Sequence, residues 1–462
     1  MTTGRRIRRG IGGVVSVLVV TGAFLFVTTP LPEIERPTLS LTTRPEAATS
    51  LLSCTGPVLA AGRNSDDAAE VQVAAEQSVV SGTAAGDAPP SVAEIASAVP
   101  DGPPVDSFSA APVDRMRTDL AAAGSARVDA DDLTGFAASA CGPPAMETWL
   151  SAGTGLTGAA DLVIIANPGD VAARVELTVF ASGGRVTPEA GAGILVPPKQ
   201  QRIVPLASLA LGEASPVVLV SATQAPVQAT LQSSLTRTLV PVGVDQGGAT
   251  GLPRAQQTIP AFSAIGEGDE PTDTAVRLLA PSDDTTASVS VTPVGGKTPA
   301  ASFPELALTA GVPIEIDLDR LSQGRYRVDV DAGAPVVASA HASTGADAGS
   351  DFAWYGTADD IRVPSLFAVA QGPQPQLAVV NPGTQEVAAV LTDDAGEGEP
   401  REIRIPAGGS ASVDLRAGGL YRLDPAGGTL RASVTFTAPD AIAGYAVVPA
   451  DAAAAPVVVR PR

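Results

Sequence analysis

Hydrophobic and polar residues alternate with a period of two in several parts of this chain. The clearest stretches are RVELTV at 174–179, IEIDLD at 314–319, YRVDVD at 326–331 and LRASVTF at 430–436. Successive side chains of a β-strand point to opposite faces, so each stretch has one buried face and one solvated face. This pattern is typical of antiparallel sheets with one side packed on a core.

Three blocks of the chain open with an apolar strand that runs into a turn. The three segments are LVIIANPGD at 162–170, VRLLAPSDD at 276–284 and LAVVNPGT at 377–384. Two further segments follow in the same order in each block, which indicates an internal repeat. We expect Leu206, Leu318 and Leu415 of the second segment to occupy equivalent core positions.

Strands of this length, separated by turns, predict a mainly β fold. Glycine and proline together make up 88 residues (47 + 41), which fits many turns better than long helices. About seven short strands in the first block favour an immunoglobulin-like β-sandwich. The predicted architecture is three tandem sandwiches, strung as a rod, over residues 151–257, 258–360 and 361–462.

Residues 51–150 are rich in alanine and are predicted to form a small α+β cap. A strand is expected over Val71–Val80. Asp114 could cap a helix that runs to Ala123, and Asp131 or Asp132 could cap another that runs to Ala140.

An uncharged apolar run, IGGVVSVLVVTGAFLFV at 11–27, follows four arginines at the start of the chain. As a helix, this run and the next two residues span about 26–29 Å, close to the thickness of a membrane's hydrocarbon core. We expect a transmembrane anchor over 11–29, a cytoplasmic tip over 1–10 and a Pro/Thr-rich stalk over 30–50, with the bulk of the chain extracellular. The alternative is a cleaved signal peptide, although an Ala-x-Ala-like cleavage site is missing after Val27.

Cys54 and Cys141 are the only cysteines, and both lie on the side predicted to be exported. An even count without metal-binding spacing in an oxidising compartment predicts one disulfide between them. The alternative is a pair of free buried thiols.

The net charge is −20, and the first 29 residues hold four arginines and no acid, so the remainder carries −24 (−20 − 4). A surface this negative repels nucleic acid, and we expect no nucleic-acid partner.

The chain offers little for catalysis or cofactor binding. It has a single histidine, His341, and neither a G-x-S-x-G nor an H-E-x-x-H motif. We therefore expect no enzyme activity and no cofactor, and we interpret His341 as a core or edge residue.

Two sets of residues could still form sites. Asp329, Asp331, Asp347 and Asp351 are candidate calcium ligands, with a solvated acidic face as the alternative. Trp149 and Trp354 each precede a repeat. They are predicted to fill domain boundaries, with sugar stacking as the alternative.

Together these features resemble an actinobacterial family of uncharacterised exported single-pass proteins. The resemblance is carried by the Arg-rich start and its span, Cys54, Cys141-Gly-Pro-Pro with Trp149, Asn167-Pro168-Gly169, and the segment 349–354, GSDFAW. It implies an envelope location and supplies no activity or functional residue. The second block departs from the pattern, with Ala280-Pro281-Ser282 in place of Asn-Pro-Gly.

The sequence therefore predicts a non-catalytic, membrane-anchored envelope protein that acts as a scaffold or interaction protein, with an unknown envelope protein or glycan as its partner. A carbohydrate-binding module for cell-wall polysaccharide is the first alternative, and an envelope hydrolase is the second.

Overall fold

Antiparallel strands make up almost all of the regular structure in this computed structural model, as the alternation predicts. The structure describes residues 41–43, 47–63, 70–114, 116–265, 273–318, 321–394, 398–450 and 457–459. Among these residues, no helix is long and apolar enough to cross a membrane. The predicted anchor at 11–29 lies outside the described residues.

The chain divides into two units, residues 46–453 and a smaller one made of residues 1–45 and 454–462. In the smaller unit, β1 (Leu41–Thr43) pairs antiparallel with β35 (Val457–Val459). All that follows concerns the larger unit.

Sandwich 1 consists of two sheets that enclose one apolar core. One sheet has the order β13-β12-β16-β10-β19, with β14 also on β12, and the other has the order β15-β11-β17-β18. Its elements are β10 (Glu147–Leu150), β11 (Leu162–Asn167), β12 (Ala173–Ala181), β13 (Gly184–Val186), η1 (Glu189–Gly191), β14 (Ile194–Val196), β15 (Gln200–Pro205), α2 (Ala207–Ala210), β16 (Val217–Thr223), β17 (Gln228–Arg237), β18 (Val240–Gly247) and β19 (Ala249–Thr250). Because β10 pairs with β16, this sandwich begins a few residues before the predicted boundary at 150.

Sandwich 2 has the same two-sheet arrangement, with one strand shared by both sheets. The first half of β25 pairs with β22 and β20, and its second half pairs with β21 and β26. Its strands are β20 (Arg254–Ala264), β21 (Thr274–Leu279), β22 (Thr285–Pro293), β23 (Ala301–Leu308), β24 (Ile314–Asp317), β25 (Gly324–Ser343) and β26 (Phe352–Gly356).

Sandwich 3 pairs its strands in the orders β30-β29-β32-β27 and β31-β28-β33-β34. Its strands are β27 (Ser365–Ala368), β28 (Gln376–Val380), β29 (Val387–Asp393), β30 (Arg401–Ile405), β31 (Ser410–Asp414), β32 (Leu420–Asp424), β33 (Arg431–Ala438) and β34 (Ala441–Ala446). We number the strands in chain order, counting β13 and β14 as one strand, leaving out β19, and counting the two halves of β25 as two strands. The strands of all three sandwiches then pair as 4-3-6-1 in one sheet and 5-2-7-8 in the other. In immunoglobulin domains, by contrast, the first strand pairs with the second. The two-sheet sandwich was therefore predicted correctly, and the immunoglobulin strand order was not.

The repeat extends to single residues. Leu206, Leu318 and Leu415 each follow the fifth strand and pack on their own sandwich core. Each donates its backbone N–H to the carbonyl of the residue beside the start of the second strand, which is Asp161, Thr274 and Pro375 respectively. The three leucines thus occupy equivalent positions, as the sequence predicts.

The N-terminal sandwich contains no helix among its described residues, so the predicted α+β cap is wrong. The last residues of the first predicted helix lie in β8, and most of the second lies in β9. The strand expected over Val71–Val80 is present as β4 and the start of β5. The strands are β2 (Ser50–Ser53), β3 (Val58–Ala61), β4 (Val71–Ala75), β5 (Ser78–Thr83), β6 (Ser91–Ile95), β7 (Val105–Ala110), β8 (Leu120–Asp129) and β9 (Thr134–Ala140). Its sheet β6-β7-β2 corresponds to strands 3-6-1 of the other sandwiches, and its sheet β5-β8-β9 corresponds to strands 2-7-8. Strands 4 and 5 have no counterpart here, and a β3–β4 hairpin is added.

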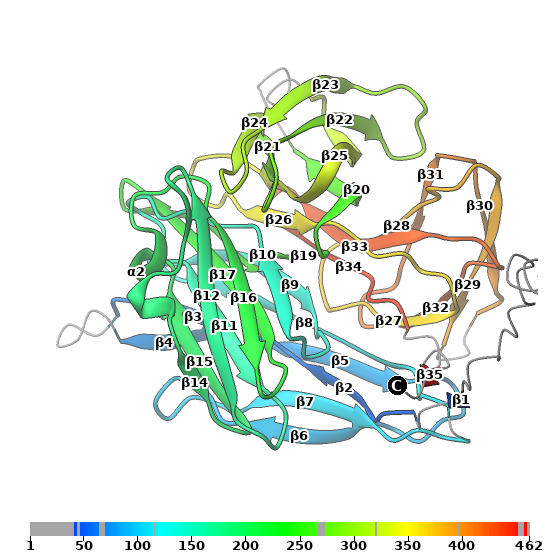
Figure 1. Ribbon diagram of the computed structural model, residues 1–462, viewed down its shortest axis with the longest axis horizontal. Helices are drawn as coiled ribbons and strands as arrows, with labels where there is room; N and C mark the ends of the chain where they lie inside the picture. The colour runs from blue at the N-terminus through cyan, green and yellow to red at the C-terminus, as the bar shows by residue number, and fades with distance from the viewer. Residues whose placement is uncertain are drawn as a thin grey trace, which may run out of the picture. The chain divides into compact units, whose positions relative to one another are not determined.

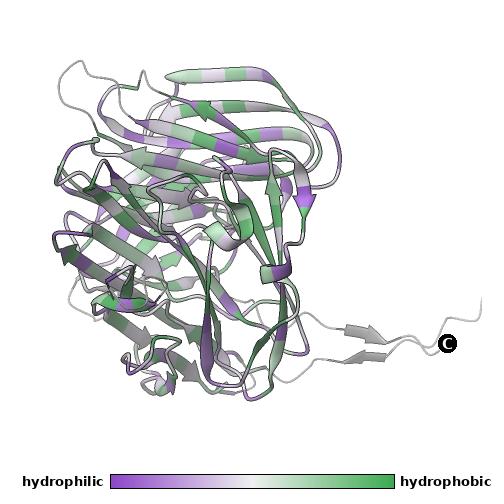
Figure 2. Cartoon of the chain, turned by 90° about the vertical axis from the view of Figure 1, so that its left-hand side faces the viewer, coloured by the Kyte–Doolittle hydropathy of each residue, from purple (hydrophilic) through white to green (hydrophobic). Residues whose placement is uncertain are grey.

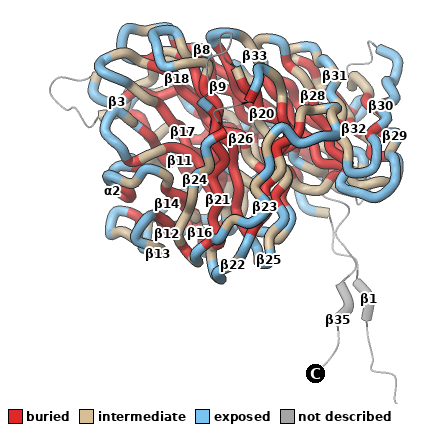
Figure 3. Tube along the Cα trace, turned by 90° about the horizontal axis from the view of Figure 1, so that it is seen from above, coloured by how far each residue is buried: buried red, intermediate tan, exposed pale blue. Residues whose placement is uncertain are grey.

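The four sandwiches do not form a rod. Their last strands meet at a common centre, where β9 lies against β18 and β34, and β26 lies against the same two strands (Figure 1). Four residues of these strands, Phe136, Val244, Phe352 and Ile442, each enter the core cluster of a neighbouring sandwich. Hydrophobic and hydrophilic residues are interspersed along the strands (Figure 2), and buried positions concentrate in the strands in the middle of the larger unit (Figure 3). We call this meeting of β9, β18, β26 and β34 the central axis.

Candidate functional site

Cys54 and Cys141 form a disulfide, as predicted. Cys54 follows β2 in one sheet of the N-terminal sandwich, and Cys141 follows β9 in the other. The bond therefore ties together the two sheets of the sandwich that lacks strands 4 and 5. For a sequence separation of 87, the chain-entropy model gives a stabilisation of about 4–5 kcal/mol.

The four candidate calcium ligands are not gathered into one site. Asp329 pairs with Arg327 at 3.0 Å and accepts a hydrogen bond from the Thr258 hydroxyl at 3.1 Å. Asp331 and Asp347 are exposed. Within the described ranges, no group of three or more Asp, Glu, His or Cys side chains could hold a metal ion.

Asp351 has a different place, buried at the central axis. Its carboxylate accepts backbone N–H bonds from Phe136 (3.2 Å), Val244 (3.4 Å) and Ile442 (3.0 Å). Burial raises the pKa of Asp351, and these donors oppose the rise. One side chain of sandwich 2 thus holds the last strands of the other three sandwiches.

A cleft of about 860 Å³ lies between sandwiches 1 and 2, within the size range of small-molecule sites. Sandwich 1 contributes the loop 153–161, residues 214–215, the end of β17 and the two-residue turn that follows it. Sandwich 2 contributes side chains from β21, β24, the second half of β25, and β26. We refer to it as the 1–2 cleft, and it is the candidate functional site.

Arg277 of β21 is the most buried cation of the 1–2 cleft. Its guanidinium is 2 % exposed and lies 2.9 Å from Glu315 and 4.3 Å from the Trp354 ring centroid. It also donates to the carbonyl of Pro216 in sandwich 1 at 2.9 Å. Since each of these contacts offsets desolvation, Arg277 and Glu315 form a satisfied pair that joins the two sandwiches.

Asp161 lies on the opposite wall and is 5 % exposed. Its carboxylate accepts N–H bonds from Thr154 (2.8 Å) and Ser234 (3.0 Å), yet burial raises its pKa to about 7. Ser233, the residue before Ser234 on β17, also lines the cleft. Its hydroxyl is buried and has no hydrogen-bond partner in the described structure. This wall therefore holds a buried carboxylate and one buried hydroxyl that the described residues leave without a partner.

His341, on β25, also lines the 1–2 cleft. Its ring centroid is 4.8 Å from that of Trp354 and 5.8 Å from that of Phe352. Burial lowers its pKa, so the imidazole is neutral at pH 7. This aromatic packing fits the expected core or edge role.

Both tryptophans lie where sandwiches 1 and 2 meet. Trp149 is buried in a cluster with Phe180 and Val217 of sandwich 1 and with Leu279 and Val337 of sandwich 2. Trp354, on β26, packs on the core of sandwich 1 and carries Arg277 over its ring.

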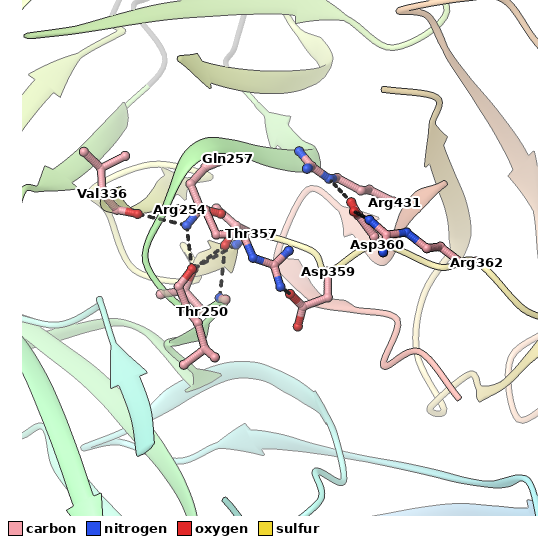
Figure 4. Close-up of polar contacts among 11 residues, drawn as sticks. Thr250, Arg254, Gln257, Val336, Thr357, Asp359, Asp360, Arg362 and Arg431 are labelled. Carbon is pink, nitrogen blue, oxygen red and sulfur yellow. Dashed lines mark hydrogen bonds and ion pairs between the residues drawn. The ribbon is translucent and has the colours of Figure 1, made fainter. Parts of the chain in front are cut away.

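A second polar cluster lies near the junction of sandwiches 2 and 3 (Figure 4). Arg254 pairs with Asp359 at 2.7 Å, and Asp360 pairs with both Arg362 (2.7 Å) and Arg431 (2.8 Å). Thr357 and Thr250 are hydrogen-bonded to each other beside these pairs. Because each arginine already has a carboxylate, this cluster is a structural junction.

A family of unknown function, DUF5719, has a model that matches residues 95–416, well over half of the chain. The chain belongs to this family. The family match runs from the end of β6 to just beyond β31, so it includes sandwiches 1 and 2 and the cleft between them. No curated protein matches the chain.

Sequence reasoning did not find the 1–2 cleft. Asp161 and Arg277 belong to different repeats, and no local motif joins them. The one available signal is that Arg277 interrupts the apolar strand of its block, at a position where the other two blocks have Ile164 and Ala378. A charged residue inside a buried strand indicates a paired partner from elsewhere in the fold.

Proposed function

We propose that this protein is a non-catalytic, membrane-anchored scaffold or interaction protein of the cell envelope. The anchor would be the apolar run at 11–29, with residues 1–10 in the cytoplasm and the sandwiches outside. The observation that carries the proposal is the central axis, because it joins four sandwiches into one body suited to presenting surfaces. The Cys54–Cys141 disulfide supports an oxidising, exported location.

The polar groups of the 1–2 cleft favour binding over hydrolysis. Hydrolysis of a glycoside needs an acid and a second free carboxylate facing the same bond. Here Glu315 and Asp273 lie against arginines, and both oxygens of Asp161 accept backbone N–H groups. Asp317 is then the one carboxylate of the lining without such contacts in the described residues, and it is exposed. His341 packs on aromatic rings, which supports a structural role for the only histidine.

Nothing in the structure favours the carbohydrate-binding alternative. Sugar-binding surfaces present aromatic rings to solvent, whereas the exposed large hydrophobic residues in the described structure are Val, Leu and Met. Trp149 and Trp354 are 4 % and 7 % exposed, so neither offers an open stacking face.

Fractionation of the native host, with the intact mass of the purified protein, tests the anchor. We expect the full-length chain in the membrane fraction, and a mature N-terminus between residues 28 and 50 would exclude the anchor. The non-catalytic assignment is tested by screening the full-length protein in detergent against cell-wall glycans and esters. Turnover that Asp161→Asn abolishes and Asp347→Asn preserves would refute it.

A further inference from the structure

We propose that the 1–2 cleft binds a primary ammonium group carried on an apolar stem, as in a lysine side chain. The inference rests on the proposed interaction function and adds the chemistry of the partner. It follows from the charges that remain in the cleft, from one unsatisfied hydroxyl and from the apolar rim.

The charges of the 1–2 cleft do not balance. Arg277 pairs with Glu315, and Arg237 lies 3.6 Å from Asp273. Two carboxylates of the lining are left, Asp161 and Asp317, and neither has an ion pair in the described part of the chain. A cation is therefore the charge that this cleft lacks.

Ser233 supplies a second and independent observation. Its hydroxyl is 3 % exposed and has no hydrogen-bond partner in the described residues. A buried hydroxyl without a partner is destabilising, and a ligand that donates a hydrogen bond to it would recover that cost. An ammonium group has three donors and no acceptor, so it could serve Ser233 and a carboxylate at once.

The rim of the cleft is apolar. Leu156 and Leu239 both line it, and Leu239 is 92 % exposed at the tip of the β17–β18 hairpin. Thr238 and Leu239 have φ values of +49° and +72°, a conformation that such residues adopt only at an energetic cost. The hairpin thus bears strain while it holds a leucine at the mouth, where it could cover an aliphatic stem.

Other cations fit less well. A divalent metal ion needs several ligands together, and the described residues contain no such group. A guanidinium is best recognised by a carboxylate with both oxygens free, and both oxygens of Asp161 already accept backbone N–H groups. A quaternary ammonium group is recognised through an aromatic face, and the Trp354 face already carries Arg277. A compact ammonium on an apolar stem remains.

The test is calorimetric titration of the full-length protein in detergent with Nα-acetyl-lysine methylamide. Nα-acetyl-norleucine methylamide has a similar stem without the ammonium group and serves as the matched probe. We expect saturable binding of the lysine probe and binding at least tenfold weaker for the norleucine probe. Ser233→Ala should weaken lysine-probe binding about tenfold, and Asp317→Asn about threefold. Asp283→Asn removes the same charge from an exposed site of sandwich 2 and should change nothing.

Three results would overturn the proposal. They are no saturable binding at millimolar probe, equal binding of both probes, or equal weakening by Asp283→Asn and Asp317→Asn. These readouts do not depend on where the protein resides, so they separate failure of the ammonium site from failure of the envelope location.

Discussion

The N-terminal sandwich and sandwich 3 share the same strand order, but different links hold their two sheets together. Sandwich 3 has all eight strands, and Asn381 at the end of β28 ties the second strand to the fourth: its amide donates to Gln385 (2.7 Å) and to Ile405 at the end of β30 (3.1 Å). The N-terminal sandwich has neither the fourth nor the fifth strand, and a disulfide joins its two sheets instead. The comparison teaches that the strand order tolerates the loss of edge strands when another link replaces them.

Sandwich 1 has the same asparagine link as sandwich 3, whereas sandwich 2 has alanine at that position. Asn167 donates to Val171 (2.8 Å) and Val196 (3.0 Å), and the backbone N–H of Gly169 donates to its Oδ1 (3.0 Å). In sandwich 2 this position is Ala280, whose carbonyl accepts the N–H of Gly311. The asparagine side chains of the Asn-Pro-Gly segments therefore stabilise turns, and we interpret these segments as structural rather than ligand-binding.

The largest effect is expected from Asp351→Ala, because it releases three sandwiches at once and leaves three buried N–H groups without an acceptor. We expect a loss of about 3–6 kcal/mol in the free energy of unfolding, measured by urea denaturation. Exposed Asp347→Ala is the control and should change stability by less than about 0.5 kcal/mol. Equal effects of the two substitutions would mean that the central axis does not hold the sandwiches together.

Removal of the disulfide tests how much this bond stabilises the N-terminal sandwich. The double substitution Cys54→Ala with Cys141→Ala should lower the free energy of unfolding by about 2–5 kcal/mol. Hydrogen exchange should show the loss of protection concentrated in β2 and β5–β9. A loss spread evenly over all four sandwiches would contradict a local role for the bond.

Asn381→Ala tests the asparagine link between the two sheets of sandwich 3. We expect a loss of about 1–3 kcal/mol, because the carbonyls of Gln385 and Ile405 lose their donor, and Asn167→Ala should behave alike. Sandwich 2 is the internal reference, since it already carries alanine at this position. If Asn381→Ala left the denaturation midpoint unchanged, the turn would be held by its proline and glycine alone.

A pH dependence of stability is expected from buried aspartates, two of which belong to sandwich 1. Burial raises the pKa values of Asp161 and Asp245 to about 7, against 3.8 for an exposed aspartate. Between these values the folded state holds more protons than the unfolded state, so the stability from these groups falls as pH rises from about 4 to about 7. We expect Tm to fall by a few degrees over that range and Asp245→Asn to flatten the profile. A Tm that rises over the same range in the wild type and equally in Asp245→Asn would contradict these assignments.

The sequence was informative where a pattern was local. Strand alternation and the ordered segments located three sandwiches and the equivalence of Leu206, Leu318 and Leu415. The helices expected near Ala123 and Ala140 were wrong because alanine has a high helix propensity, and sheet packing overrode it. Ala123 and Ala140 illustrate this, because they are register partners on β8 and β9, and Ala123 also pairs with Val80 of β5.

Long-range features could not be predicted in the same way. The fourth copy was hidden because it lacks two strands and carries an inserted hairpin. Asp351 was considered as a calcium ligand, since nothing in GSDFAW reveals that its partners are backbone groups in three other sandwiches. The 1–2 cleft depends in the same way on contacts between repeats.

The central axis also bears on how such a chain can change in length during evolution. In open solenoids each repeat touches only its neighbours, so copies can be gained or lost at little cost. Here the first copy closes against the last, because Phe136 of β9 enters the core of sandwich 3. A fifth copy could not be inserted into this closed arrangement. Deletion of a copy would expose the apolar core ends of its two neighbours to water. The repeat number is therefore fixed at four by geometry, and variation should be confined to loops and edge strands.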